Sequence, residues 1–94
     1  MAIGVGILGF AHGHVNSYCT RWRDEPELGV RVVAGWDHDP QRREASAAQF
    51  GIEAAGSVAD LLARDEIAAV VIGAETSRHA ELVEQSAAAG KAII

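Results

Sequence analysis

Two hydrophobic periods alternate along the chain: short apolar runs without polar alternation are separated by longer amphipathic segments. The short runs are typical of strands buried on both faces of a sheet, and they are too short for helices. They predict strands at Ile3–Leu8, Val30–Trp36, Ile52–Ala55, Ala68–Ile72 and Lys91–Ile94. The third of these runs is shorter and weaker than the first two.

The first amphipathic segment begins at His14 and has the period of a helix. One face of this helix carries residues at i, i+3, i+4 and i+7: Val15, Tyr18, Cys19 and Trp22. We expect this face to pack against the sheet, so that Cys19 and Trp22 belong to the core. Pro26 and Gly29 then end the helix.

Capping signals mark the other helices. Asp39 before Pro40 predicts a helix start, and Gly51 predicts its end. Ser57 is expected to cap a third helix. The last helix covers 77–89, with Thr76 or Ser77 as its cap and an inward face formed by His79, Leu82, Val83, Ser86 and Ala87.

Strands and helices therefore alternate over the whole chain with short connections, which predicts a single α/β domain spanning residues 1–94. We expect a Rossmann-type, doubly wound parallel sheet in strand order 3-2-1-4-5, truncated at the fifth strand. Right-handed crossovers then place the first two helices on one face and the last two on the other. A crevice opens between the carboxyl ends of strands one and four, lined by Gly9–His14 and Gly73–Thr76.

The glycines after the first strand are the main candidate for ligand binding. The literal pattern G-x-G-x-x-G falls on Gly4, Gly6 and Gly9, but the first two lie inside the strand, whereas a phosphate loop must follow it. The useful register is Gly9-Phe10-Ala11-His12-Gly13-His14, where amides at the start of a helix favour an anion. The alternative is a turn that binds no ligand.

Asp37 ends the second strand, 28 residues after Gly9. A carboxylate at this place accepts hydrogen bonds from the adenosine ribose hydroxyls, a preference for NAD. The alternative is a turn carboxylate shared with Asp39. NADP is the second cofactor candidate: Arg42 or Arg43 would face its 2′-phosphate, although the charge of Asp37 opposes that phosphate.

The histidines offer weaker candidates. His12 and His14 are two residues apart, but no carboxylate or cysteine stands at matching spacing, so no metal site is expected. His79 is either a cofactor contact or a packing and capping residue. Thr76 and Ser77, at the start of the same helix, are either its N-cap or contacts beside a nicotinamide ribose.

Composition narrows the function. The chain is 49% hydrophobic and 22% charged, has a formal net charge of -5 and contains one cysteine. Scattered basic residues argue against nucleic acid binding, and a lone cysteine excludes an internal disulfide. Without a leader or a long apolar run, the expected location is cytoplasmic and off the membrane.

Several short motifs, taken together and in order, carry a resemblance to a known family. They are Val5-Gly6-Ile7-Leu8-Gly9, Val33-Ala34-Gly35-Trp36-Asp37 with Asp39-Pro40, Phe50-Gly51, Val70-Val71-Ile72 followed by Ser77-Arg78-His79-Ala80-Glu81, and Ala87-Ala88-Ala89-Gly90-Lys91. Over essentially its whole length the chain resembles the N-terminal domain of the glucose–fructose oxidoreductase/inositol dehydrogenase (Gfo/Idh/MocA) family.

This resemblance implies an NAD(P)-dependent oxidoreductase acting on sugars, polyols or small carbonyl compounds. It implies that Gly9–His14 hold the pyrophosphate and Asp37 the adenosine ribose. Gly73 ends the neighbouring strand; Ala74-Glu75-Thr76 would approach the nicotinamide ribose, and His79 would complete that corner. A small-molecule substrate and a homo-oligomer of the full-length enzyme are the implied partners.

The chain departs from the family pattern at Ala11 and His14, where small residues are common, and at Glu75, where proline is usual. The Glu-Lys-Pro motif with its catalytic lysine and the substrate domain are expected after Ile94, so the 94-residue chain is predicted not to turn over substrate. Three alternatives remain: a non-catalytic sensor of NAD(H) or another adenosine ligand, a methyltransferase, and a receiver domain. The receiver is disfavoured because Leu8-Gly9 stand where it needs acidic residues.

Overall fold

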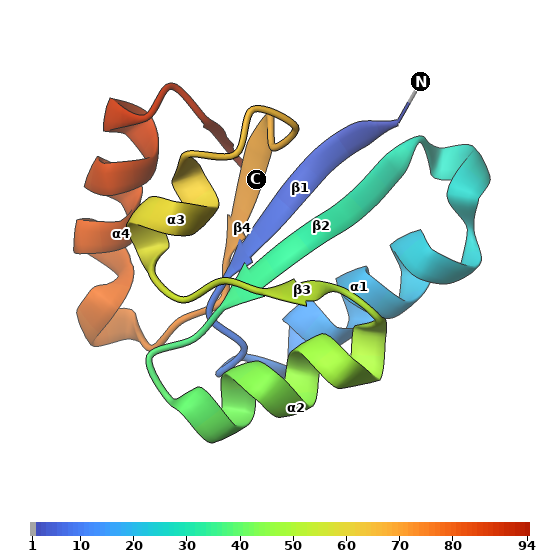
Figure 1. Cartoon of the computed structure of the whole chain (residues 1–94), viewed down its shortest axis with the longest axis horizontal. Helices are drawn as coiled ribbons and strands as arrows, with labels where there is room; N and C mark the ends of the chain where they lie inside the picture. The colour runs from blue at the N-terminus through green and yellow to red at the C-terminus, as the bar shows by residue number, and fades with distance from the viewer. Residues whose placement is uncertain (1) are drawn as a thin grey trace.

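The structure, a computed structural model, describes residues 2–94. Its strands follow the five predicted apolar runs, with the third and fifth shorter than expected: β1 Ile3–Leu8, β2 Val30–Trp36, β3 Glu53–Ala54, β4 Ala69–Ile72 and β5 Ala92–Ile93. All pair in parallel in the order β3-β2-β1-β4-β5 (Figure 1). The predicted Rossmann-type sheet is confirmed.

Helices connect the strands where the amphipathic segments predicted them: α1 Gly13–Asp24, α2 Pro40–Phe50, α3 Val58–Leu62 and α4 Thr76–Ala88, with a short 3₁₀ turn η1 at Pro26–Leu28. Gly29 and Gly51 end η1 and α2 with positive φ angles of 76° and 65°, a conformation that suits glycine. No helix among residues 2–94 is long and apolar enough to cross a membrane.

Two separate apolar clusters lie on the two faces of the sheet. One joins alternate residues of β1 and β4 to α1 and α2: Val5, Ile7, Phe10, Val15, Cys19, Phe50, Ala69 and Val71. The other takes the intervening residues of these strands with α3 and α4, including Leu8, Leu61, Ile67, Val70, Ile72 and Leu82. β1 and β4 are therefore buried on both sides, which is why their sequences show no polar alternation.

The inward faces of α1 and α4 are narrower than predicted. Val15 and Cys19 are buried, whereas Tyr18 is 42% exposed and stacks on half-buried Trp22 with ring centroids 5.5 Å apart. In α4 only Leu82 and Ser86 are buried, while His79 and Ala87 are exposed. Each helix buries one i, i+4 pair against the sheet, and partly buried Trp22 and Val83 pack beside these pairs.

Candidate functional site

The loop after β1 is folded tightly against the loop after β4. Gly9 has a φ of 99°, and a Cβ there would lie 2.5 Å from the backbone of Ala74. The Gly9 amide donates to the carbonyl of Trp36 at 2.7 Å, and the His12 amide donates to that of Gly73 at 3.1 Å. The two loops predicted to line the crevice are thus joined at the carboxyl edge of the sheet.

The helices that begin at these two loops lack a side-chain cap. His12 is the N-cap of α1 without a side-chain hydrogen bond, and no acidic residue lies in the first turn of that helix. By contrast, Asp39 accepts from the amides of Gln41 and Arg42 at the start of α2, and Ser57 caps α3.

The predicted cap of α4 is wrong. Glu75 rather than Thr76 or Ser77 occupies the N-cap position, again without a side-chain bond. The carboxylate of Glu75 instead accepts a hydrogen bond from Arg42.

An anion suits the start of α1. Amides in the first turn of a helix have no intrahelical acceptor, and the helix dipole adds partial positive charge. Nothing lies within 4 Å of a Cβ placed on Gly13, so the space beside the first residue of α1 is open. The residues present therefore fit the diphosphate of a dinucleotide.

Phe10 contributes to this site only through its backbone. Its ring is buried, stacks against Phe50 with centroids 6.4 Å apart, and lies where a Cβ on Gly35 would be. Its amide donates to Asp37 Oδ2 at 2.8 Å. The side chain therefore anchors the loop in the core, while the amide fixes the carboxylate.

Asp37 is almost completely buried, with 1% exposure. Oδ2 accepts from the Phe10 amide and from Arg42 Nε at 2.9 Å; Oδ1 accepts from the Asp39 amide at 2.9 Å and from Arg42 Nη2 at 3.0 Å. Burial alone would raise the pKa of Asp37, but the bonds from Arg42, Asp39 and Phe10 outweigh it and hold the pKa below its ordinary value. These four donors match the acceptor capacity of a carboxylate.

Arg42 joins this carboxylate to the loop after β4. Its Nη2 also donates to Glu75 Oε2 at 3.0 Å, so one guanidinium bridges two carboxylates that lie 38 residues apart in sequence. The two carboxylates raise the pKa of Arg42. The pKa of Glu75 is lowered by the backbone amide of Glu75 itself and by Arg42.

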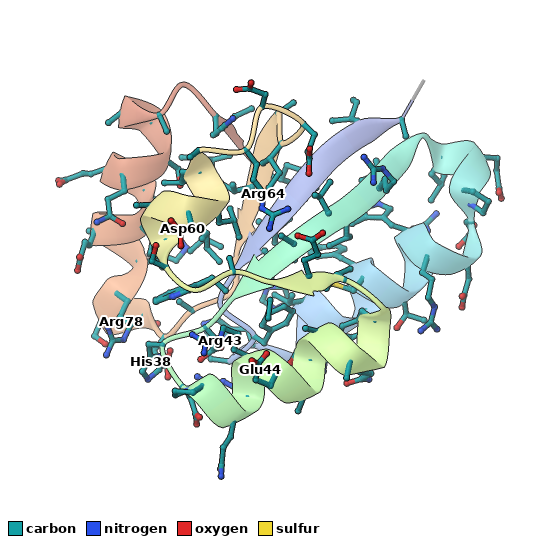
Figure 2. All side chains as sticks on the ribbon, in the orientation of Figure 1. His38, Arg43, Glu44, Asp60, Arg64 and Arg78 are labelled. Atoms are coloured by element: carbon teal, nitrogen blue, oxygen red, sulfur yellow. The ribbon has the colours of Figure 1, made fainter. Side chains whose placement is uncertain are left out.

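His38 completes the cluster. Its Nδ1 lies 3.5 Å from both Asp37 Oδ1 and Glu75 Oε1, and Figure 2 shows it near the starts of α2 and α4. Within residues 2–94, Glu75 Oε1 is buried without a hydrogen-bond partner.

The predicted site residues divide into two groups. The structure brings together Gly9–His12, Asp37 and Gly73–Glu75. His14 instead lies on the exposed side of α1, stacked on His12 and edge-on to Tyr18, while Thr76 and His79 are exposed on α4. Exposure of His79 excludes the packing role.

Sequence reasoning did not place Arg42 and His38 in the site. The sequence indicates Arg42 only as a partner for a 2′-phosphate. Arg42 lies five residues after Asp37, beyond the helix start that Asp39 caps, and this spacing could have indicated its contact with Asp37. No feature of the sequence indicates its contact with Glu75.

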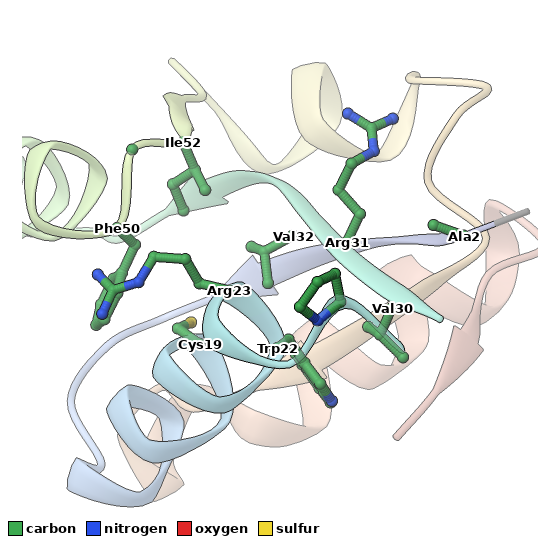
Figure 3. Close-up of a pocket in the computed structure, with 11 residues that line it drawn as sticks. Ala2, Cys19, Trp22, Arg23, Val30, Arg31, Val32, Phe50 and Ile52 are labelled. Carbon is green, nitrogen blue, oxygen red and sulfur yellow. The ribbon is translucent and has the colours of Figure 1, made fainter. Parts of the chain in front are cut away.

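A cavity of about 280 Å³ lies apart from this crevice, between α1, η1 and β2 (Figure 3). Apolar side chains dominate its wall, among them Cys19, Trp22, Val32, Phe50 and Ile52. Burial raises the pKa of the Cys19 thiol to about 11, which keeps it protonated and unreactive at neutral pH. The thiol of Cys19 therefore adds no reactive group to the candidate site.

Comparison with known proteins gives one family and several similar structures. The model of an oxidoreductase family, described as having an NAD-binding Rossmann fold, matches residues 2–94. A candidate myo-inositol dehydrogenase from Sinorhizobium meliloti is 34% identical, with a TM-score of 0.81 over 98% of this chain and 27% of that protein. KijD10, a 3-ketoreductase from Actinomadura kijaniata in complex with TDP-benzene and NADP, is 26% identical, with a TM-score of 0.85 over 100% and 29%.

The WlbA dehydrogenase from Bordetella pertussis, in complex with NADH and UDP-GlcNAcA, is 20% identical and supports the fold alone, with a TM-score of 0.84 over 99% of this chain and 28% of that protein. The chain thus spans less than a third of the length of these proteins. No curated protein sequence is significantly similar to it.

Proposed function

Because the chain belongs to this oxidoreductase family with its NAD-binding Rossmann fold, we propose that it is the dinucleotide-binding part of a hydride-transferring enzyme. The observation that carries the proposal is the uncapped start of α1 beside the buried carboxylate of Asp37. A diphosphate would lie against the loop Gly9–His14 and bind the amides of Gly13 and His14, because those of Gly9, Phe10 and His12 already have acceptors. The adenosine ribose would reach Asp37.

The other site residues have supporting roles in this proposal. Gly73 lets the two loops meet, because a Cβ there would lie 2.7 Å from the Gly9 carbonyl oxygen. Ala74, Glu75 and Thr76 would border the cofactor, and exposed His79 would contact its nicotinamide side. The bound nicotinamide would supply the hydride acceptor or donor, while these residues bind and orient it.

The proposed substrate is a sugar, a polyol or a related small carbonyl compound. Similarity to the candidate inositol dehydrogenase and to the 3-ketoreductase supports this class. We also propose that the whole enzyme is a homo-oligomer, which rests on the sequence resemblance, and that it is located in the cytoplasm, as expected from the sequence. Direct substrate contacts would come mainly from parts of such an enzyme outside these 94 residues.

Calorimetric titration with NADH, with a charge placed at the start of α1, tests the proposal. Gly13→Asp puts a carboxylate into open space, where it favours the helix dipole but repels a diphosphate. Ala59→Asp is the matched control, since it adds the same charge to the first turn of α3 at an exposed position. Circular dichroism checks that both variants are folded.

We expect the wild-type chain and Ala59→Asp to bind NADH alike, and Gly13→Asp to bind at least about tenfold more weakly. Equal binding by Gly13→Asp would remove the start of α1 from the site. A wild-type chain that bound S-adenosylmethionine but neither NADH nor NADPH would overturn the proposed function.

A further inference from the structure

The proposed ribose carboxylate is already saturated in this structure. Asp37 has four bonds, two from backbone amides and two from Arg42. The amides of Phe10 and Asp39 belong to the loops that form the edge of the crevice, whereas Arg42 reaches Asp37 with a side chain that is one-third exposed. A ribose diol can therefore form hydrogen bonds with Asp37 only by displacing the Arg42 guanidinium.

Glu75 provides the second anchor for that guanidinium. Arg42 Nη2 lies 3.0 Å from Glu75 Oε2, so a guanidinium that leaves Asp37 still has a carboxylate partner. The second oxygen, Oε1, is buried without a hydrogen-bond partner among residues 2–94, with His38 Nδ1 3.5 Å away. Glu75 is therefore able to accept further donors from a displaced Arg42.

The same arrangement opposes a 2′-phosphate. Two carboxylates and one guanidinium leave one net negative charge when His38 is neutral, and the arginine that would pair with phosphate is occupied by both carboxylates. A phosphate monoester carries about -1.5 to -2 charges at neutral pH and pairs best with an arginine fork that is free. Bound to Glu75, Arg42 does not offer that fork.

We propose that Glu75 is a specificity-determining residue, which holds Arg42 so that Asp37 accepts the ribose diol of NAD and NADP is disfavoured. This inference rests on the proposed function, because it concerns the adenosine end of the same site. It gives a role to the carboxylate of Glu75, which stands where proline is usual in the family that the sequence resembles. Without the charge of Glu75, displaced Arg42 would be free to pair with a 2′-phosphate.

Parallel titrations with NADH and NADPH at pH 8 test this inference. Glu75→Gln removes the charge and Glu75→Ala also removes the acceptor. Glu81→Gln is the control, because it removes the same charge from an exposed position of α4. Arg42→Gln, alone and combined with Glu75→Gln, shows whether any effect passes through the guanidinium.

We expect the wild-type chain to prefer NADH. Both Glu75 variants should shift the affinity ratio toward NADPH by about tenfold, and Glu81→Gln should leave it within about twofold. In the Arg42→Gln background the Glu75 effect should disappear. A ratio unchanged by Glu75→Gln, shifted equally by Glu81→Gln, or still shifted without Arg42 overturns the inference while NADH binding stands. Binding of neither dinucleotide by the wild-type chain overturns the proposed function itself.

Discussion

Neutralising Asp37 should destabilise the fold as well as the site. In Asp37→Asn the side chain keeps its shape, but one acceptor oxygen becomes an NH2 group facing donors. That group would oppose either the Phe10 amide together with Arg42 Nε, or the Asp39 amide together with Arg42 Nη2, depending on its orientation. The perturbation therefore tests whether this carboxylate holds the loop after β1 in place.

The magnitude follows from the contacts. A buried donor left unsatisfied costs about 1–3 kcal/mol, and a hydrogen bond to a charged group contributes about 1.5–3 kcal/mol. Arg42 is one-third exposed, so solvent screens its share of the ion pair. We expect a total loss of about 2–4 kcal/mol at pH 7. This is a large part of the total stability of a small domain, which is typically about 5–15 kcal/mol.

Urea unfolding followed by the fluorescence of Trp22 and Trp36 measures this loss, with exposed Asp65→Asn as the control. The folded protein lowers the pKa of Asp37 below the ordinary value of 3.8. The stability difference between wild type and Asp37→Asn is therefore fully present above pH 3.8 and is lost as the pH falls through the folded-state pKa.

Two results would refute this reasoning. One is a loss at pH 7 no larger than that of Asp65→Asn, which should stay within about 0.5 kcal/mol. The other is a difference that does not shrink below pH 3.8.

Three further predictions concern the loop and the core. Gly9→Ala should lower the free energy of unfolding in urea by about 2–4 kcal/mol, since its Cβ would meet the backbone of Ala74 at a φ of 99°. Gly13→Ala, in open space, should be nearly neutral, and equal effects of the two substitutions would contradict the loop geometry. Leu61→Ala, at a fully buried position, should cost about 2–5 kcal/mol by the same measurement, and a loss below about 1 kcal/mol would argue against the packing of α3. Cys19 should resist alkylation at pH 8 in the folded chain and react once unfolded in urea; rapid native labelling would contradict its burial.

The fold was largely predictable because its strongest signals are local. Unbroken apolar runs predicted β1 and β4, a β-branched run predicted β2, and Gly29 and Gly51 marked the ends of η1 and α2. The expected strand order was that of a Rossmann-type sheet, and the handedness of crossovers then placed two helices on each face. The strands β3 and β5 have two residues each, too few to give firm boundaries.

Helix orientation was predicted less well than helix position. The period of α1 allowed both Tyr18 and Cys19 on the inward face, because i+3 and i+4 lie next to each other. The helix buries Cys19 and leaves Tyr18 exposed, stacked on Trp22, which is half-buried and packs against the core. Rotation of a helix by a fraction of a turn depends on the opposing sheet surface, which periodicity alone does not give.

The site was predicted as a place rather than as a set of contacts. The carboxyl ends of β1, β2 and β4 had to meet, so Gly9, Asp37 and Gly73 were expected near one another. The bond between Arg42 and Glu75 depends instead on the conformations of two long side chains from distant segments. No spacing rule along the sequence brings such a pair together.

The proposed function requires that the crevice at the carboxyl edge of β1, β2 and β4 bind a nicotinamide dinucleotide. Titration of the ¹⁵N-labelled chain with NADH, followed by amide chemical shifts, tests it most directly. We predict saturable shifts that are largest at Gly13, His14 and Thr76. Shifts centred instead on the separate cavity near Cys19 and Ile52, or no shifts at saturating NADH, would contradict the claim.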